Sequence, residues 1–121
     1  MAKILVTDDS AFLRKRTCSI LIPTGHEIIQ AKDGLECVEQ LLEEKPDALF
    51  LDLVMPNMNG FEVLEYMQAH DVNVPTVVLT ADIQEGVSER CMSLGAVAYL
   101  NKPPKSDEVL AALDFILDDD V

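Results

Sequence analysis

Short apolar runs alternate with longer amphipathic segments along the chain. Five runs have the length and the β-branched or aromatic content of strands, and three of these are almost continuously apolar. Continuous apolar strands are typical of a sheet covered on both faces, as parallel sheets are. The expected strands are residues 3–7, 27–31, 48–53, 76–80 and 98–101.

Apolar residues at helical spacing fill the segments between these runs. Leu35, Val38 and Leu41 fall on one helix face, with glutamates on the opposite side. The expected helices are residues 11–21, 35–42, 61–67, 84–94 (ended by Gly95) and 109–116. This strand–helix alternation predicts a doubly wound α/β fold with right-handed crossovers. The 121 residues are enough for a single domain over 1–121, with residues 118–121 as a frayed acidic tail.

The charge of the chain is strongly negative. Nine basic residues against 22 acidic ones give a net charge of −13, which disfavours binding to nucleic acid or to anionic membranes. No apolar run approaches the ~20 residues that a membrane span requires, and no signal peptide is evident. Three cysteines without C-x-x-C spacing suit a reducing compartment. We therefore expect a cytoplasmic protein without membrane insertion, whose partner is a protein or a metal cation.

Polar side chains follow four of the five expected strands. Asp8 and Asp9 follow the first strand and Asp52 lies at the third, while Thr80 ends the fourth and Lys102 follows the fifth. Since the carboxyl ends of parallel strands share one edge of the sheet, these side chains are expected to meet in one cleft. Three carboxylates repel one another, so they require compensating charge from Lys102 and from a hard divalent cation such as Mg²⁺.

This residue set fits phosphoryl transfer to an aspartate. Aspartate is a known nucleophile that forms an aspartyl phosphate, and the transfer requires a metal ion and donors to the phosphoryl oxygens. Asp52 is the expected acceptor, with Asp8 and Asp9 holding the metal and with Thr80 and Lys102 contacting the phosphoryl group. No glycine-rich phosphate loop is present, so nucleotide binding is not indicated. Each aspartate alone is also compatible with a helix cap.

Five segments in combination resemble response-regulator receiver domains, and in particular chemotaxis-type stand-alone regulators. The resemblance covers essentially the whole chain and implies a flavodoxin-like (βα)5 fold with strand order 2-1-3-4-5. It implies a phosphorylation-activated switch of a two-component system that assists its own phosphoryl transfer and dephosphorylation but is not an enzyme. The segments are VTDDSAFLRK (6–15), GHEIIQAKDG (25–34), DALFLDLVMPNMNG (47–60), VPTVVLTA (74–81) and LGAVAYLNKP (94–103).

The resemblance also implies residue roles at the site. Asp52 is expected to accept a phosphoryl group from a sensor histidine kinase. Asp9, Asp52 and the backbone carbonyl of Val54 are expected to bind Mg²⁺ directly, and Asp8 partly through water. Lys102 is the expected phosphate partner.

The implied response to phosphorylation involves a switch pair and an output surface. Thr80 and Tyr99 resemble the family's switch residues, and the Lys102–Pro103 peptide is expected to be cis. The output surface comprises residues 84–94, 98–101 and 106–117 and binds a downstream target protein, with a flagellar motor, a kinase and a phosphorelay partner left open. A monomer is expected.

Two features depart from the family pattern. Pro104 follows Pro103 where a bulky apolar residue is more common, so the loop before the last helix should be stiffer. Val54 and Asp82 occupy positions that influence how fast the phosphoryl group is lost; valine cannot orient a water molecule by hydrogen bonding, whereas aspartate can.

Three alternative functions remain open from the sequence alone. An aspartate-nucleophile phosphohydrolase normally has a second acid where Val54 stands. A flavodoxin-like electron carrier would need hydroxyls and free backbone donors where Asp8 and Asp9 lie. A receiver-like module that binds proteins without phosphorylation would not need the complete set of site residues.

Overall fold

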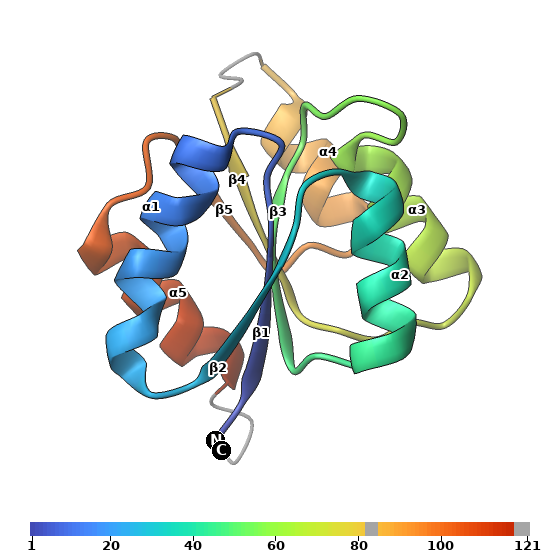
Figure 1. Cartoon of the computed structure of the whole chain (residues 1–121). Helices are drawn as coiled ribbons and strands as arrows, with labels where there is room; N and C mark the ends of the chain where they lie inside the picture. Colours follow the sequence, from blue (N-terminus) through green and yellow to red (C-terminus); the bar gives the residue numbers. More distant parts are fainter. Residues whose placement is uncertain (82–84, 118–121) are drawn as a thin grey trace.

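The five strands form one parallel sheet in the order β2-β1-β3-β4-β5. The computed structural model describes residues 1–81 and 85–117, so the expected acidic tail (118–121) and Asp82 lie outside the described residues. The expected doubly wound α/β fold and its strand order are confirmed (Figure 1). The strands are β1 Lys3–Thr7, β2 Glu27–Ala31, β3 Ala48–Asp52, β4 Thr76–Thr80 and β5 Ala98–Asn101.

Helices cover both faces of this sheet (Figure 1), with α1 and α5 on one face and α2, α3 and α4 on the other. Within the described part of the chain, no helix is long and apolar enough to cross a membrane. The helices are α1 Ala11–Leu21, α2 Gly34–Glu44, α3 Gly60–Ala69, α4 Val87–Ser93 and α5 Ser106–Leu117, with a short 3-10 helix at Ile22–Thr24.

The three central strands bury side chains on both faces, which explains their continuous apolar runs. In β3, Phe50 packs into the cluster with residues of α1 and α5. Its neighbours Leu49 and Leu51 belong to the opposite cluster, which includes residues of α2, α3 and α4. All three side chains are fully buried. The edge strand β2 differs, because its charged and polar residues Glu27 and Gln30 are exposed.

Side-chain caps start three of the helices, and two of these, α1 and α2, begin within four residues of a strand end. Ser10 accepts a hydrogen bond from the Leu13 N–H at the start of α1. Asn59 and Glu62 form a reciprocal capping box at the start of α3, and Asp33 caps α2. These caps satisfy backbone donors that a helix cannot bond internally. The connection from β1 to α1, which carries the first two candidate acids, is therefore short.

The start of α4 is a correction to the sequence prediction. The expected helix over 84–94 begins at Val87, because Gly86 has a left-handed φ of 90° and interrupts helical geometry before it. Gln84 lies outside the described residues. Gly95, with φ 105°, follows the helix end as expected. Strand β3 ends at Asp52 rather than at Leu53.

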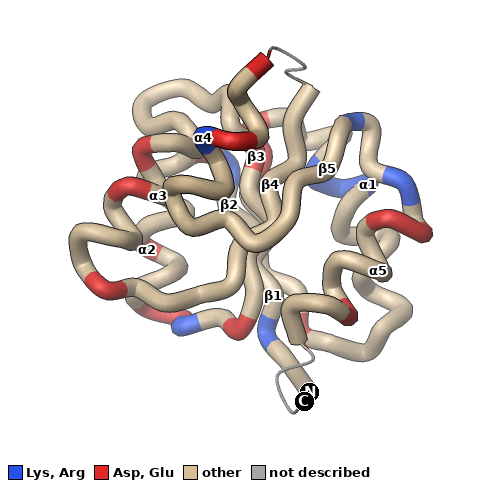
Figure 2. Tube along the Cα trace, turned by 180° about the vertical axis from the view of Figure 1, so that it is seen from behind, with Lys and Arg blue, Asp and Glu red and all other residues tan. Residues whose placement is uncertain are grey.

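The charge of the protein is unevenly distributed (Figure 2). Acidic residues occur on α2, α3, α4 and α5, whereas α1 contains Arg14, Lys15 and Arg16 and no acid. The helix that directly follows Asp8 and Asp9 is thus the basic helix of a strongly acidic protein.

Candidate functional site

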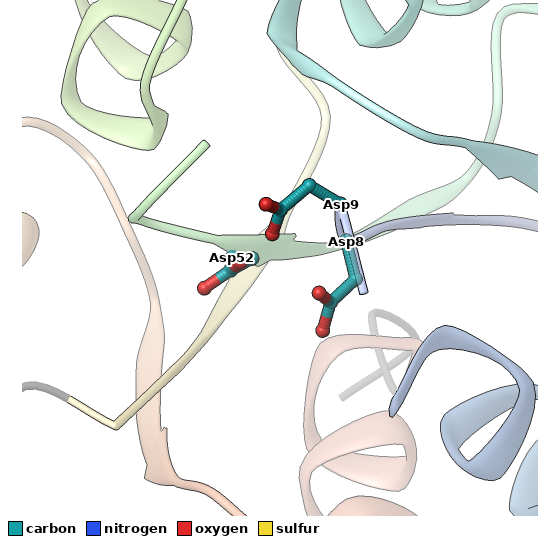
Figure 3. A group of neighbouring side chains, drawn as sticks. All are labelled: Asp8, Asp9 and Asp52. Atoms are coloured by element: carbon teal, nitrogen blue, oxygen red, sulfur yellow. The ribbon is translucent and has the colours of Figure 1, made fainter. Parts of the chain in front are cut away.

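Three carboxylates meet at the carboxyl edge of the sheet (Figure 3). Asp8 and Asp9 follow β1, and Asp52 is the last residue of the neighbouring strand β3. One carboxylate oxygen from each residue lies within 4.8 Å of the other two. Asp8 and Asp52 are buried, whereas Asp9 is exposed. The structure therefore brings together the three acids that the sequence places at strand ends.

A buried ammonium group lies beside two of these acids. The Lys102 Nζ is 2.7 Å from Asp8 Oδ2 and 3.1 Å from Asp52 Oδ1. The backbone N–H of Lys102 donates to the Thr80 carbonyl oxygen at 2.9 Å, and the Lys102–Pro103 peptide bond is cis. Three carboxylates against one ammonium leave an excess of two negative charges at the site.

The protonation of Asp52 reflects these surroundings. Burial raises the pKa of Asp52 from 3.8 to about 6, and the charge of Asp8 acts in the same direction. The charge of Lys102 and a hydrogen bond from the Val54 backbone oppose this rise in pKa. An added cation would favour the charged carboxylate further.

The donor set fits a divalent metal ion. Carboxylate oxygens are preferred ligands of hard cations such as Mg²⁺, and the cluster offers three of them with unbalanced negative charge. Val54, the expected source of a backbone ligand, lies two residues beyond Asp52, and this residue is 69% exposed. Because the Val54 side chain is aliphatic, Asp52 is the acidic ligand that this part of the chain offers, and Asp8 and Asp9 come from the β1–α1 connection.

The expected switch residues lie on β4 and β5. Asp52 pairs with Leu79, so Thr80 is the next residue along the strand beside the acceptor candidate. Thr80 is fully buried. Tyr99 pairs with Val78 and is half-buried against the core cluster that includes residues of α2, α3 and α4. Both residues thus occupy neighbouring strands near the carboxyl edge.

Arg14 on α1 contacts the site and was not singled out from the sequence. Its Nη1 donates to the Asp8 carbonyl oxygen at 2.6 Å, and its Nε donates to Gln30 Oε1 on β2 at 2.9 Å. The available signal was a basic residue one turn into the helix that follows the acid pair. That signal is weak, because Lys15 and Arg16 are equally basic neighbours.

Comparison with known proteins identifies the family. The sequence matches the response regulator receiver domain over residues 4–114. It is 35% identical over 115 residues to the chemotaxis protein CheY of Listeria monocytogenes, covering 94% of this chain and 97% of the relative. It is 38% identical over 117 residues to the response regulator MprA of Mycobacterium ulcerans, covering 95% of this chain and 50% of that protein.

Solved structures agree with this fold. The Vibrio cholerae chemotaxis protein CheY4 superposes with a TM-score of 0.87 at 28% identity, covering 96% of this chain and 98% of the other. A CheY-like receiver domain protein of Methanospirillum hungatei gives a TM-score of 0.90 at 25% identity, covering 98% and 94% of the two chains.

The chain belongs to the response regulator receiver domain family. It is a phosphorylation switch domain of two-component signalling rather than an enzyme, and it carries an acidic site consistent with a divalent metal ion. Receiver domains work with histidine kinases and downstream targets. Because the chain belongs to this family, the phosphohydrolase and electron-carrier alternatives are incorrect.

Proposed function

We propose that Asp52 accepts a phosphoryl group from the phosphohistidine of a sensor histidine kinase. The observation that carries this proposal is the buried Asp52 carboxylate beside Lys102, with two further acids within 4.8 Å. In the transfer, an Asp52 oxygen forms a bond to phosphorus while the phosphorus–nitrogen bond breaks, and its electron pair returns to the kinase histidine. The Lys102 charge favours the carboxylate form that this attack requires.

Asp9, Asp52 and the backbone carbonyl of Val54 are the proposed direct ligands of Mg²⁺. A bound Mg²⁺ supplies positive charge that offsets the charge on the phosphoryl oxygens. Asp8 would act partly through water, as the resemblance to receiver domains implies, while its Oδ2 pairs with Lys102 at 2.7 Å. The excess of two negative charges in the site supports this assignment.

Thr80 and Lys102 respond to the phosphorylated form in this proposal. A phosphoryl group brings additional negative charge and new acceptor oxygens to Asp52. Lys102, already 3.1 Å from Asp52, pairs with that charge, and the Thr80 hydroxyl donates a hydrogen bond to it. Tyr99 then turns inward into the space that Thr80 leaves. Its half-buried position against the core supports this role.

The output surface consists of α4, β5 and α5, and it binds a downstream target protein. Changing this surface from about 1% to about 99% active requires ~5.5 kcal/mol of differential stabilisation, which the new contacts of Thr80 and Lys102 must help to supply. The 35% identity with a chemotaxis protein favours a chemotaxis or flagellar target. We also assign residues 1–121 to one domain that acts as a cytoplasmic monomer and does not bind nucleic acid.

Labelling with acetyl phosphate tests the acceptor assignment. The wild-type protein with Mg²⁺ should take up phosphate, and Asp52→Asn should abolish the uptake. Asp47→Asn is the matched control, because Asp47 directly precedes β3 and Asp52 ends it. Chelation of Mg²⁺ should also abolish labelling. Retained stoichiometric labelling of Asp52→Asn would refute the assignment, whereas a folded wild-type protein that takes up no phosphate would favour the phosphate-independent binding module.

A further inference from the structure

Helix α1 holds the peptide group that joins Asp8 to Asp9. We propose that Arg14 is a positioning residue that orients these two acids for binding a divalent cation; this inference rests on the proposed Mg²⁺ site. The Arg14 Nη1 lies 2.6 Å from the Asp8 carbonyl oxygen, and its Nε lies 2.9 Å from Gln30 Oε1. One guanidinium group thus connects α1, β2 and the loop that carries both acids.

The bonded oxygen belongs to the peptide plane between Asp8 and Asp9. Because a peptide group is planar, holding its oxygen restricts rotation of the whole plane and therefore the direction in which the Asp9 side chain leaves the backbone. The other side of Asp8 is also held, since its N–H donates to the Ala31 carbonyl oxygen at 3.2 Å. Residue 8 is consequently anchored through both of its backbone polar groups.

The two acids differ in what holds their carboxylates. Asp8 forms the ion pair with Lys102 and accepts a hydrogen bond from the Ser10 N–H at 2.9 Å. The Asp9 carboxylate is exposed and has no hydrogen bond or ion pair among residues 1–81 and 85–117. Its direction therefore depends on the backbone, and Arg14 holds that backbone.

The chemistry of arginine suits this task. Its planar guanidinium presents several donors in a fixed geometry, so it bonds the Asp8 carbonyl and Gln30 at the same time. A lysine has one terminal nitrogen and does not reproduce this arrangement. Arg14 is also half-buried, in contrast to the exposed Lys15 next to it.

Charge and positioning predict opposite effects on cation binding. A positive charge near an acidic site opposes an incoming cation, so its removal alone would strengthen Mg²⁺ binding. Loss of the peptide contact would instead misorient Asp9 and weaken binding. The sign of the change therefore separates a positioning role from a purely electrostatic one.

Titration with Mg²⁺, monitored through the amide chemical shifts, measures whether a variant binds the ion more weakly or more tightly than the wild type. Arg14→Met should weaken binding by about 10-fold, because removal of groups that orient metal ligands typically costs about 10–100-fold in affinity. Arg14→Lys keeps the opposing positive charge but does not reproduce the two contacts of the guanidinium, so its loss of affinity should be at least as large. Lys15→Met removes the same charge from the same helix and should bind Mg²⁺ at least as tightly as the wild type.

A second measurement needs no metal. Amide hydrogen exchange at Asp9 and Ser10 in the metal-free protein should accelerate in Arg14→Met and remain unchanged in Lys15→Met. If Arg14→Met does not fold, Gln30→Leu, which frees the other end of the guanidinium, should show the same changes to a smaller extent.

The outcomes separate this inference from the proposed function. A folded Arg14→Met protein that binds Mg²⁺ as tightly as the wild type, or that shows unchanged exchange at Asp9 and Ser10, would overturn the role of Arg14. Failure of the wild-type protein itself to bind Mg²⁺ would overturn the metal site instead, and the positioning role toward cations with it.

Discussion

The Lys102 ammonium reaches across β4 to lie 3.1 Å from Asp52 Oδ1, since β4 separates β5 from β3 in the sheet. Both side chains are almost fully buried, at 9% and 5% exposure. A buried charge without a partner is costly, so the charged carboxylate of Asp52 depends on the nearby Lys102 ammonium. This dependence links the stability of the domain to the chemistry of its proposed acceptor.

Replacing Lys102 with methionine should have opposite effects on stability and on Mg²⁺ binding. Without metal, Asp8 and Asp52 lose their cationic partner, and the free energy of unfolding should fall by about 1–3 kcal/mol at pH 7. With Mg²⁺ present, removal of a competing cation should strengthen metal binding. Urea unfolding and Mg²⁺ titration measure the two effects. Lys105→Met, at an exposed position in the following loop, is the control and should change neither.

Stability should depend on pH through Asp52. Its pKa is raised from 3.8 to about 6 in the folded protein, so between these values the folded chain binds the proton more strongly than the unfolded chain. The free energy of unfolding of the metal-free protein should therefore decrease as the pH rises through this range and remain low above it. Asn cannot titrate, so Asp52→Asn should be more stable than the wild type by about 1–3 kcal/mol at neutral pH.

The control for this prediction is how the difference in free energy of unfolding between Asp52→Asn and the wild type changes with pH. The extra stability of Asp52→Asn should shrink as the pH is lowered through about 6 toward 4, because wild-type Asp52 then becomes protonated and neutral. Urea denaturation at several pH values without metal measures it. A difference that stays constant over this range would contradict the raised pKa of Asp52.

Gly60 should be required for the close packing of α3 on the end of β3. A Cβ atom at this position would lie 2.5 Å from the Asp52 carbonyl oxygen and 2.8 Å from the Leu53 Cα, so the backbone at the proposed acceptor would have to move. Gly60→Ala should lower the free energy of unfolding by about 1–3 kcal/mol and shift the amide resonance of Asp52. Glu65→Ala, at an exposed position of the same helix, should leave that resonance in place.

The sheet and its acids were predictable because both depend on local patterns. The buried runs of β1, β3 and β4 predicted strands covered on both faces, and Asp8, Asp9 and Asp52 follow from the rule that parallel strands end at one edge. The resemblance to receiver domains added the strand order.

The remaining features depend on contacts that no sequence pattern encodes. Arg14 bonds a backbone carbonyl, which every residue possesses, so residue types alone could not indicate its partner. The start of α4 depends on the left-handed conformation of Gly86, and glycine is compatible with many conformations. The raised pKa of Asp52 results from its burial, which requires the assembled fold.

A contact between α3 and α4 should help to hold the proposed output surface in place. The Arg90 guanidinium on α4 lies 3.9 Å above the centre of the Phe61 ring, and Phe61 directly follows Gly60 on α3. Such cation–π contacts contribute about 0.5–1 kcal/mol at exposed sites. Arg90→Met should therefore lower stability by about this amount and accelerate amide exchange along α4, whereas Glu89→Gln should not.

A double-mutant cycle with Phe61→Leu measures whether the two side chains act together. If the stacking contributes as expected, Arg90→Met should cost stability in the wild-type background and nearly nothing when Phe61 is already leucine. Because Phe61 is next to Gly60, which packs on the Asp52 backbone, such coupling would give a short physical connection between the proposed acceptor and α4. Additive costs in the two backgrounds would show that the stacking does not hold α4 in place.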